Sequence, residues 1–220
     1  MAGQLLPSTS CVRFVQPRRY NARGVLCTLG PRVTSIGTAQ TRLLVLRGNS
    51  GAGKSTIARR VRSRLTGCVA WVEQDYVRRV VLHEHDIPDG LNIGLIAQTV
   101  RYALDHGCDV ILDGILYAAH YAEMLRALRD DHRGRTRWYW FDVSLEETLR
   151  RHATRPQANA FGADAMRHWY RARDPLPFAT ETRVPEAWTI DQTVDRIVSD
   201  MQRGSSPRRV PDPTRYIDGL

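Results

Sequence analysis

The sequence is 220 residues long and is 42% hydrophobic, 25% charged and 8% aromatic, which predicts a folded domain with a hydrophobic core. No apolar run comes close to the length of about 20 residues that is needed to cross a bilayer, so we expect no membrane-spanning segment. The formal net charge is +9, but the excess of basic residues lies wholly before Glu73, the first acidic residue. This placement indicates a basic face for phosphate-rich ligands or an Arg-rich arm, rather than a nucleic-acid-binding surface over the whole domain.

Both ends of the chain have the composition of disordered segments. Residues 1–40 contain no acidic residue and no sustained hydrophobic periodicity, so we interpret them as a disordered Arg-rich arm. A targeting segment, an upstream reading-frame artefact and a structured segment remain alternatives. Residues 204–220 place three prolines among arginines, which predicts a disordered tail.

The cysteines are widely scattered, at Cys11, Cys27, Cys68 and Cys108. No two of them form a Cys-x-x-Cys pair, so their spacing predicts neither a zinc site nor a disulfide framework. The sequence therefore favours a reducing, cytoplasmic location.

Between the two ends, residues 41–203 alternate short apolar runs with amphipathic stretches. The apolar runs predict strands at 43–46, 68–72, 110–112, 138–143 and around 181–185. The amphipathic stretches predict helices at 54–65, 91–106, 117–129, from 144 onward and around 190–201. Ser144 and Glu147 have the spacing of a capping box for the fourth helix. This alternation predicts an α/β fold, a doubly wound and mainly parallel sheet of five strands covered on both faces.

The strongest motif lies between the first predicted strand and the first predicted helix. Residues 48–55, Gly-Asn-Ser-Gly-Ala-Gly-Lys-Ser, match the P-loop pattern G-x-x-x-x-G-K-[ST]. Glycines let the backbone N–H groups point at phosphate oxygens, and the helix adds the positive end of its dipole. Lys54, the only lysine of the chain, is expected to reach the β- and γ-phosphates, and the Ser55 hydroxyl to bind Mg²⁺. The predicted ATP-binding residues are Gly48, Asn49, Ser50, Gly51, Ala52, Gly53, Lys54, Ser55 and Thr56.

Two aspartates follow predicted strands, at the edge where an open α/β sheet places its ligands. Asp75, after the second strand, could take the proton of an acceptor hydroxyl during phosphoryl transfer, and Glu73 is the next candidate for that role. The alternative for Asp75 is a helix N-cap. Asp113, after the third strand, has the position of a Walker B acid and is a predicted catalytic residue that holds Mg²⁺ through water or orients the acceptor. The alternative for Asp113 is a turn aspartate before Gly114.

Arginines follow the fourth strand and its helix, where a kinase carries its lid. Arg150, Arg151 and Arg155 precede Pro156, and the planar guanidinium suits γ-phosphoryl oxygens. We expect Arg151 and Arg155 to take part in catalysis, although such arginines more often form a solvated face. Residues 161–174 interleave aromatics with arginines, which could stack on a base; we favour a buried helix stripe with a charged back.

Several segments resemble known kinases. Gln74-Asp75, followed by Tyr76 and Arg78, is similar to the Gln-Asp segment of uridine kinases, whose aspartate serves as base. Asp113-Gly114-Ile115-Leu116 is similar to their Glu-Gly-Ile-Leu segment, with aspartate in place of glutamate. The stretch from Phe141 to Arg155 resembles phage-type polynucleotide kinases, whose arginines form the lid over ATP. Chloramphenicol phosphotransferases and zeta-type toxins share the general plan, and the resemblance covers about residues 42–202.

The resemblance implies a P-loop kinase fold of the nucleoside and nucleotide kinase type over residues 41–203. With ATP and Mg²⁺, such an enzyme would phosphorylate a hydroxyl of a nucleoside or another small molecule, such as an antibiotic. A kinase for polynucleotide ends is the alternative within the enzyme class, but a nucleic-acid partner is not favoured. A nucleotide-dependent switch without an acceptor is the alternative outside it. A Ras-like GTPase is disfavoured, because its Asn-Lys-x-Asp motif needs a second lysine. The sequence does not indicate an oligomeric state.

Overall fold

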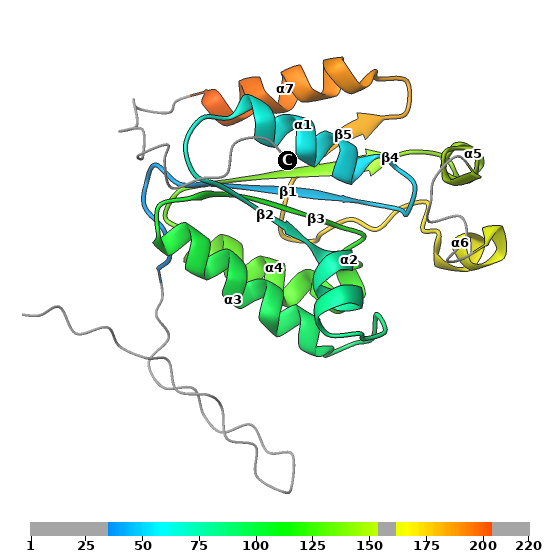
Figure 1. Ribbon diagram of the computed structural model, residues 1–220, viewed down its shortest axis with the longest axis horizontal. Helices are drawn as coiled ribbons and strands as arrows, with labels where there is room; N and C mark the ends of the chain where they lie inside the picture. Colours follow the sequence, from blue (N-terminus) through cyan, green and yellow to red (C-terminus); the bar gives the residue numbers. More distant parts are fainter. Residues whose placement is uncertain (1–34, 154–161, 204–220) are drawn as a thin grey trace, which may run out of the picture. The chain divides into compact units, whose positions relative to one another are not determined.

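Five apolar segments form one parallel sheet in the computed structural model, which describes residues 35–153 and 162–203 (Figure 1). The strands are β1 (Arg42–Gly48), β2 (Val69–Glu73), β3 (Asp109–Gly114), β4 (Arg135–Asp142) and β5 (Thr182–Pro185). Their order across the sheet is β2-β3-β1-β4-β5, and each neighbouring pair is parallel. The predicted five-stranded α/β fold of the P-loop type is therefore confirmed.

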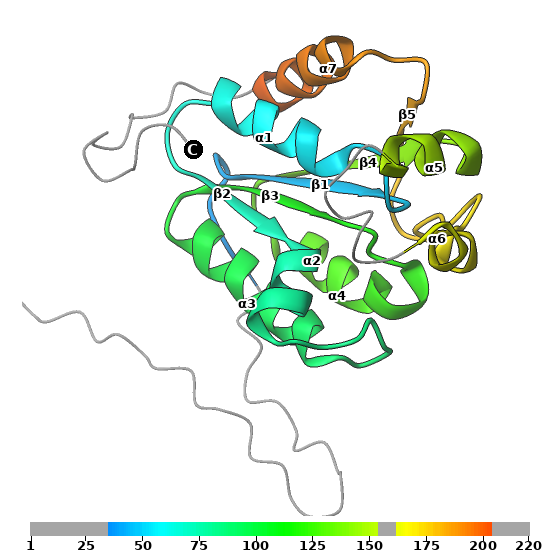
Figure 2. The same ribbon diagram turned by 45° about the vertical axis from the view of Figure 1, so that its right-hand side comes forward.

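Helices cover both faces of this sheet (Figures 1 and 2). One face carries α1 (Lys54–Arg64) and α7 (Ile190–Gln202), and the other carries α3 (Leu91–Asp105) and α4 (Ala118–Asp131). The short α2 (Gln74–Tyr76) runs into the π-helical turn η1 (Val77–Val81). At the carboxyl end of the sheet lie α5 (Leu145–Ala153) and α6 (Ala163–Trp169). No helix in the described part of the chain is long and apolar enough to cross a membrane.

The hydrophobic core forms two layers because strand side chains alternate between the faces of the sheet. On β1, Leu43 and Val45 pack in the layer that contains the buried side chains of α3 and α4. Leu44 and Leu46 pack in the opposite layer, with those of α1 and α7. All four side chains are fully buried, so β1 is the central, rigid strand from which the P-loop leaves.

The folded unit begins before residue 41. Ile36 is 2% exposed and belongs to the core under α3 and α4. Its N–H donates to the Asp131 carbonyl at 2.7 Å, and its carbonyl accepts from the N–H of Arg133 at 3.0 Å. The predicted arm of residues 1–40 is therefore too long by several residues. Residues 1–34 and the predicted tail, 204–220, lie outside the described residues.

A disulfide joins Cys68 and Cys108, with the two Cα atoms 4.6 Å apart, so the prediction of no disulfide is wrong. Each cysteine immediately precedes one residue of the paired positions Val69 and Asp109 of β2 and β3. The parallel register thus brings together two residues that are 40 positions apart in the sequence. Spacing along the chain does not reveal a pair that depends on which strands are neighbours.

Candidate active site

The P-loop connects β1 to α1 in a tightly curled conformation. Gly51 has φ 84°, a backbone conformation that favours glycine, and a Cβ there would lie 2.7 Å from the carbonyl oxygen of Thr148. The Lys54 Nζ donates to the carbonyls of Gly48 and Asn49 at 2.7 and 2.8 Å. The lysine side chain therefore folds back onto the loop, and its ammonium group is bound to two of the loop's carbonyls.

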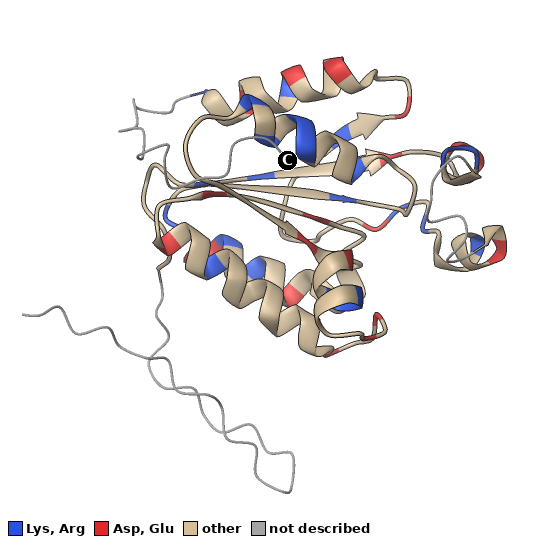
Figure 3. Cartoon of the chain, in the orientation of Figure 1, with Lys and Arg blue, Asp and Glu red and all other residues tan. Residues whose placement is uncertain are grey.

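Two carboxylates flank the hydroxyl of Ser55, the second residue of α1. The Ser55 Oγ donates to Asp113 Oδ2 at 2.7 Å and lies 3.3 Å from Glu73 Oε1. Glu73 and Asp113 are partners in the register of β2 and β3, and Figure 3 shows acidic residues at the carboxyl ends of both strands. Two carboxylates and a hydroxyl are the oxygen ligands that Mg²⁺ prefers, directly or through water. The residues present therefore fit the predicted metal.

The electrostatics of these carboxylates follow from their burial. Burial raises the pKa of Asp113, while hydrogen bonds from Ser55 and from Trp71 Nε1, at 2.9 Å, act in the opposite direction. Burial and the charge of Asp113 raise the pKa of Glu73. The surroundings therefore disfavour the charged forms of both acids, and a bound cation would stabilise those forms. The sequence predicted Glu73 only as an alternative base and not as a metal ligand, although it ends an apolar strand. Trp71 was not among the predicted site residues.

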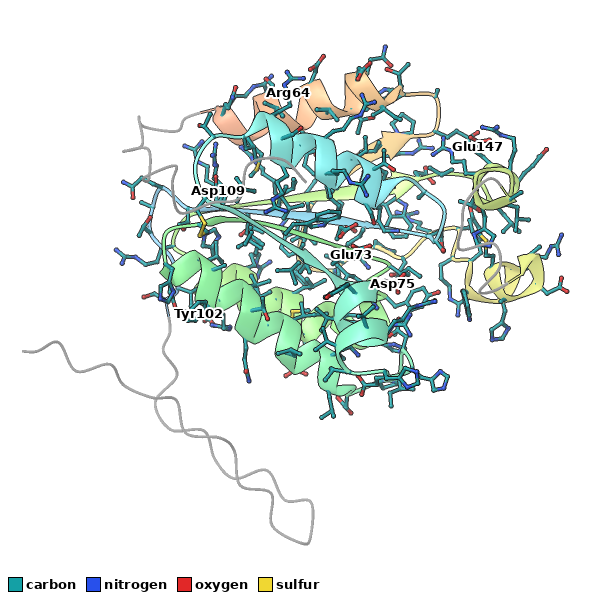
Figure 4. All side chains as sticks on the ribbon, in the orientation of Figure 1. Arg64, Glu73, Asp75, Tyr102, Asp109 and Glu147 are labelled. Carbon is teal, nitrogen blue, oxygen red and sulfur yellow. A yellow bond between two sulfur atoms is a disulfide. The ribbon has the colours of Figure 1, made fainter. Side chains whose placement is uncertain are left out.

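Asp75 lies one turn further on, in the first turn of α2, beside Glu73 at the end of β2 (Figure 4). Its side chain is 46% exposed and is paired with Arg78 at 2.8 Å and with Arg79 at 3.5 Å. The N-cap of α2 is Glu73, so the alternative role of Asp75 as an N-cap is not observed. The structure brings Asp75 close enough to Glu73 and Asp113 for their charges to interact, and leaves its carboxylate accessible to an acceptor.

The predicted lid arginines differ in position. Arg151 donates from Nη1 to the Ala52 carbonyl of the P-loop at 3.1 Å, and from Nε to Glu147 at 2.6 Å. Arg150 is exposed and pairs with Glu147 on its own helix. These two arginines lower the pKa of Glu147 to about 2. Arg155 lies outside the described residues. Of the three arginines, Arg151 contacts the P-loop, as we expect of a lid arginine.

The predicted capping box of α5 is only half formed. Ser144 Oγ accepts from the N–H of Glu147 at 3.3 Å. The Glu147 carboxylate does not return the bond, because it is bound by Arg150 and Arg151, and the N–H of Ser144 donates to Glu186 Oε2 instead, at 2.9 Å. The ionic contacts are stronger than a neutral capping bond, which explains the difference.

A cavity of about 360 Å³ adjoins the P-loop on the side of β4 and β5. It is lined by residues of the P-loop and α5, including Ala52 and Arg151, and by residues after β5, including Glu186, Trp188 and Thr189. The carboxylates of β2 and β3 lie on the other side of β1 in the strand order. The loop therefore separates a cavity with an aromatic wall from a cluster of acids.

Residues 162–174 do not form the predicted buried stripe. Within α6 only Met166 is buried, and Trp169 and Tyr170 are half-buried. Arg171 is exposed, and its guanidinium lies 5.4 Å from the centre of the Tyr117 ring. The aromatics of this segment therefore do not fill the core, and residue 161 lies outside the described residues.

Comparison with known proteins gives one family match. A family model described as an AAA domain, AAA_33, matches residues 43–175. No curated protein matches the chain.

Several solved structures have the same fold. The APS kinase of Mycobacterium tuberculosis in complex with AMPPNP and APS is 19% identical, with a TM-score of 0.56 over 76% of this chain and 98% of that one. A putative kinase from Chloroflexus aurantiacus is 16% identical, with a TM-score of 0.59 over 76% and 100%. A sugar kinase from Janibacter is 18% identical, with a TM-score of 0.56 over 76% and 99%. At these identities the similarity shows the fold of P-loop kinases, as the sequence predicted.

Proposed function

Because the chain belongs to the AAA domain family AAA_33, we propose that it is a P-loop kinase that transfers the γ-phosphoryl group of ATP to a hydroxyl of a nucleoside or another small molecule. The observation that carries this proposal is the arrangement around Ser55. Its hydroxyl contacts two carboxylates, while the accessible Asp75 lies two residues beyond the end of β2. A module that only binds nucleotide has no need of the additional, exposed carboxylate.

The nucleotide would occupy the P-loop and the cavity next to it. Residues 48–56 receive the phosphates, and the Lys54 ammonium exchanges its two loop carbonyls for phosphate oxygens. Arg151, already against Ala52, lies where its guanidinium can neutralise charge on the γ-phosphoryl group. The base fits the cavity that Trp188 lines. Bound through Ser55, Asp113 and Glu73, Mg²⁺ would supply charge neutralisation on the β- and γ-phosphates.

The acceptor would approach from the side of β2 and β3. Its hydroxyl oxygen forms a bond to the γ-phosphorus while the bond from that phosphorus to the β–γ bridging oxygen breaks, and the hydroxyl proton passes to Asp75. Glu73 is less suited to this role, because its Oε1 faces Ser55. Asp75 pairs with Arg78 and Arg79 instead, and these arginines would stabilise charge that gathers at the acceptor.

The test is transfer of label from [γ-³²P]ATP to a panel of nucleosides, aminoglycosides, phenicols and oligonucleotides with a free 5′-hydroxyl. A labelled small molecule, lost in Asp75→Asn while ATP binding persists, is the expected result. Labelling of oligonucleotides alone, with affinity that falls steeply with salt, would identify a polynucleotide-end kinase. Slow hydrolysis without any labelled acceptor, together with nucleotide-dependent capture of a protein, would refute the kinase and indicate a switch.

A further inference from the structure

One arginine of the central strand is entirely buried. Arg47, the next-to-last residue of β1, has no exposed surface. Its Nε and Nη2 donate to the carbonyl of Leu116 at 3.0 and 2.8 Å. Nη2 also contacts Asp174 Oδ2 at 2.7 Å, and Nη1 contacts Glu181 Oε1 at 2.8 Å. A buried guanidinium is tolerated only when its donors are satisfied in this way, so the chain is built around this contact.

Asp174 and Glu181, the two carboxylates that pair with Arg47, also accept hydrogen bonds from backbone N–H groups. Asp174 Oδ2 also accepts from the N–H of Ala118, the first residue of α4, at 2.8 Å. Glu181 Oε2 accepts from the N–H of Leu176 at 3.1 Å. Arg47 therefore connects the end of β1 to the start of α4 and to both ends of residues 174–181, which lead into β5.

The P-loop holds the beginning of the same stretch. Asn49 is 4% exposed; its Nδ2 donates to the carbonyl of Arg171 at 2.8 Å, and its Oδ1 accepts from the N–H of Arg171 at 2.9 Å. A carboxamide both donates and accepts, so it satisfies both backbone groups at once. Residues 171–181, here called the return segment, are thus fixed by Arg47 and by Asn49, two positions apart.

The return segment borders the acceptor side of the site. Arg171 lies over Tyr117, four residues after Asp113. The N–H of Ile115, in the same connection, donates to Gln74 Oε1 at 3.2 Å, and Gln74 directly precedes Asp75. A continuous set of contacts therefore runs from the P-loop, through the return segment and the residues after β3, to the proposed base.

We propose that Arg47 and Asn49 are positioning residues that hold the return segment against the phosphate loop as a fixed wall of the acceptor site. The inference rests on the proposed kinase function. The return segment would keep the acceptor hydroxyl in line with the phosphoryl group that the adjacent loop holds. A misplacement of about 1 Å can lower the rate up to about a hundredfold. Release of the return segment should lower kcat/KM for the acceptor and leave ATP binding intact.

Replacing Asp174 is the mildest way to release the return segment, because replacing Arg47 leaves two partly buried carboxylates unpaired and endangers folding. Asp174→Ala should lower kcat/KM for the acceptor by about tenfold to a hundredfold, with KM for ATP unchanged within about twofold. Asp174→Asn, which keeps an oxygen acceptor for Arg47 and Ala118, should restore most of the loss. Asp164→Ala, an exposed carboxylate of α6 paired with Arg167, is the matched control and should behave as the wild type.

A second readout does not depend on any acceptor. Amide hydrogen exchange over residues 171–181 should be at least about tenfold faster in Asp174→Ala than in the wild type or in Asp164→Ala. Unchanged exchange would overturn the proposal, and so would an equal rise of KM for ATP and for the acceptor. If the wild type phosphorylates no acceptor, the kinase function fails by itself, and the exchange experiment alone decides whether the return segment is held.

Discussion

Removal of residues 35–40 should destabilise the domain, whereas removal of residues 1–34 should not. A chain that begins at residue 41 loses Ile36, which is 2% exposed, and its backbone bonds to Asp131 and Arg133. Burial of an isoleucine side chain contributes about 1.5–3 kcal/mol, and each hydrogen bond about 1 kcal/mol. The expected loss is about 3–5 kcal/mol of unfolding free energy, which lowers the melting temperature by roughly 10 °C for a domain of this size.

Urea and thermal unfolding of three chains, starting at residues 1, 35 and 41, would measure this difference. The first two should unfold together, because the sequence predicts an arm that buries little apolar surface. Ile36→Ala in the full chain should reproduce about half of the loss, since it keeps the backbone bonds. Equal stability of the chains that start at 35 and at 41 would refute the assignment of Ile36 to the core.

Four further results are expected. Lys54→Ala should abolish phosphoryl transfer without lowering the melting temperature, because the ammonium serves a ligand; near-normal turnover would exclude the P-loop as the site. Asp75→Asn should lower transfer about 10²–10⁴-fold with ATP affinity retained, whereas Asp113→Asn should raise the Mg²⁺ concentration needed for half-maximal rate; normal turnover of Asp75→Asn would place the base elsewhere. Cys108→Ser removes a disulfide that joins residues 40 positions apart and should lower the free energy of unfolding, measured with urea, by up to about 4 kcal/mol. Activity should be kept, because the disulfide lies at the opposite end of the strands. An unchanged urea midpoint would contradict this expected loss of stability. Burial lowers the pKa of His132 below 6.5, so below about pH 6.5 the unfolded state binds a proton that the folded state does not bind, and the free energy of unfolding should fall as the pH drops. His132→Gln should flatten this part of the plot of unfolding free energy against pH. A plot identical to that of the wild type would assign the effect to another group.

The elements that were predicted correctly are those whose signal is local. The P-loop motif, the apolar run of β3 and the aspartate after it can each be recognised within about ten residues. The limits of β1 could not be predicted from such a local signal, because the charged residues Arg42 and Arg47 indicate the ends of the strand. Both lie inside it, since Arg42 is paired with Asp109 and Arg47 with Glu181.

The features that were missed depend on the order of the strands. The Cys68–Cys108 disulfide and the approach of Glu73 to Ser55 join segments that become neighbours when β3 is placed between β2 and β1. The ion pairs of Arg47 join β1 to the segment that leads into β5. An alternating pattern of strands and helices predicts a parallel sheet but does not state this order. Long-range pairs of buried charges are therefore the part of the site that a single sequence hides.

The single lysine of the chain gives the protein an unusual chemical property. Lys54 is 8% exposed, and its amine contacts two carbonyls of the curled loop. A lysine-directed reagent that reacts with a lysine side chain must therefore react at the P-loop. A protease specific for lysine can cut only one peptide bond of the chain, the bond between Lys54 and Ser55, at the start of α1. Acylation or cleavage at this position thus reports on opening of the phosphate loop alone, without labels, against a background of arginines that neither chemistry touches.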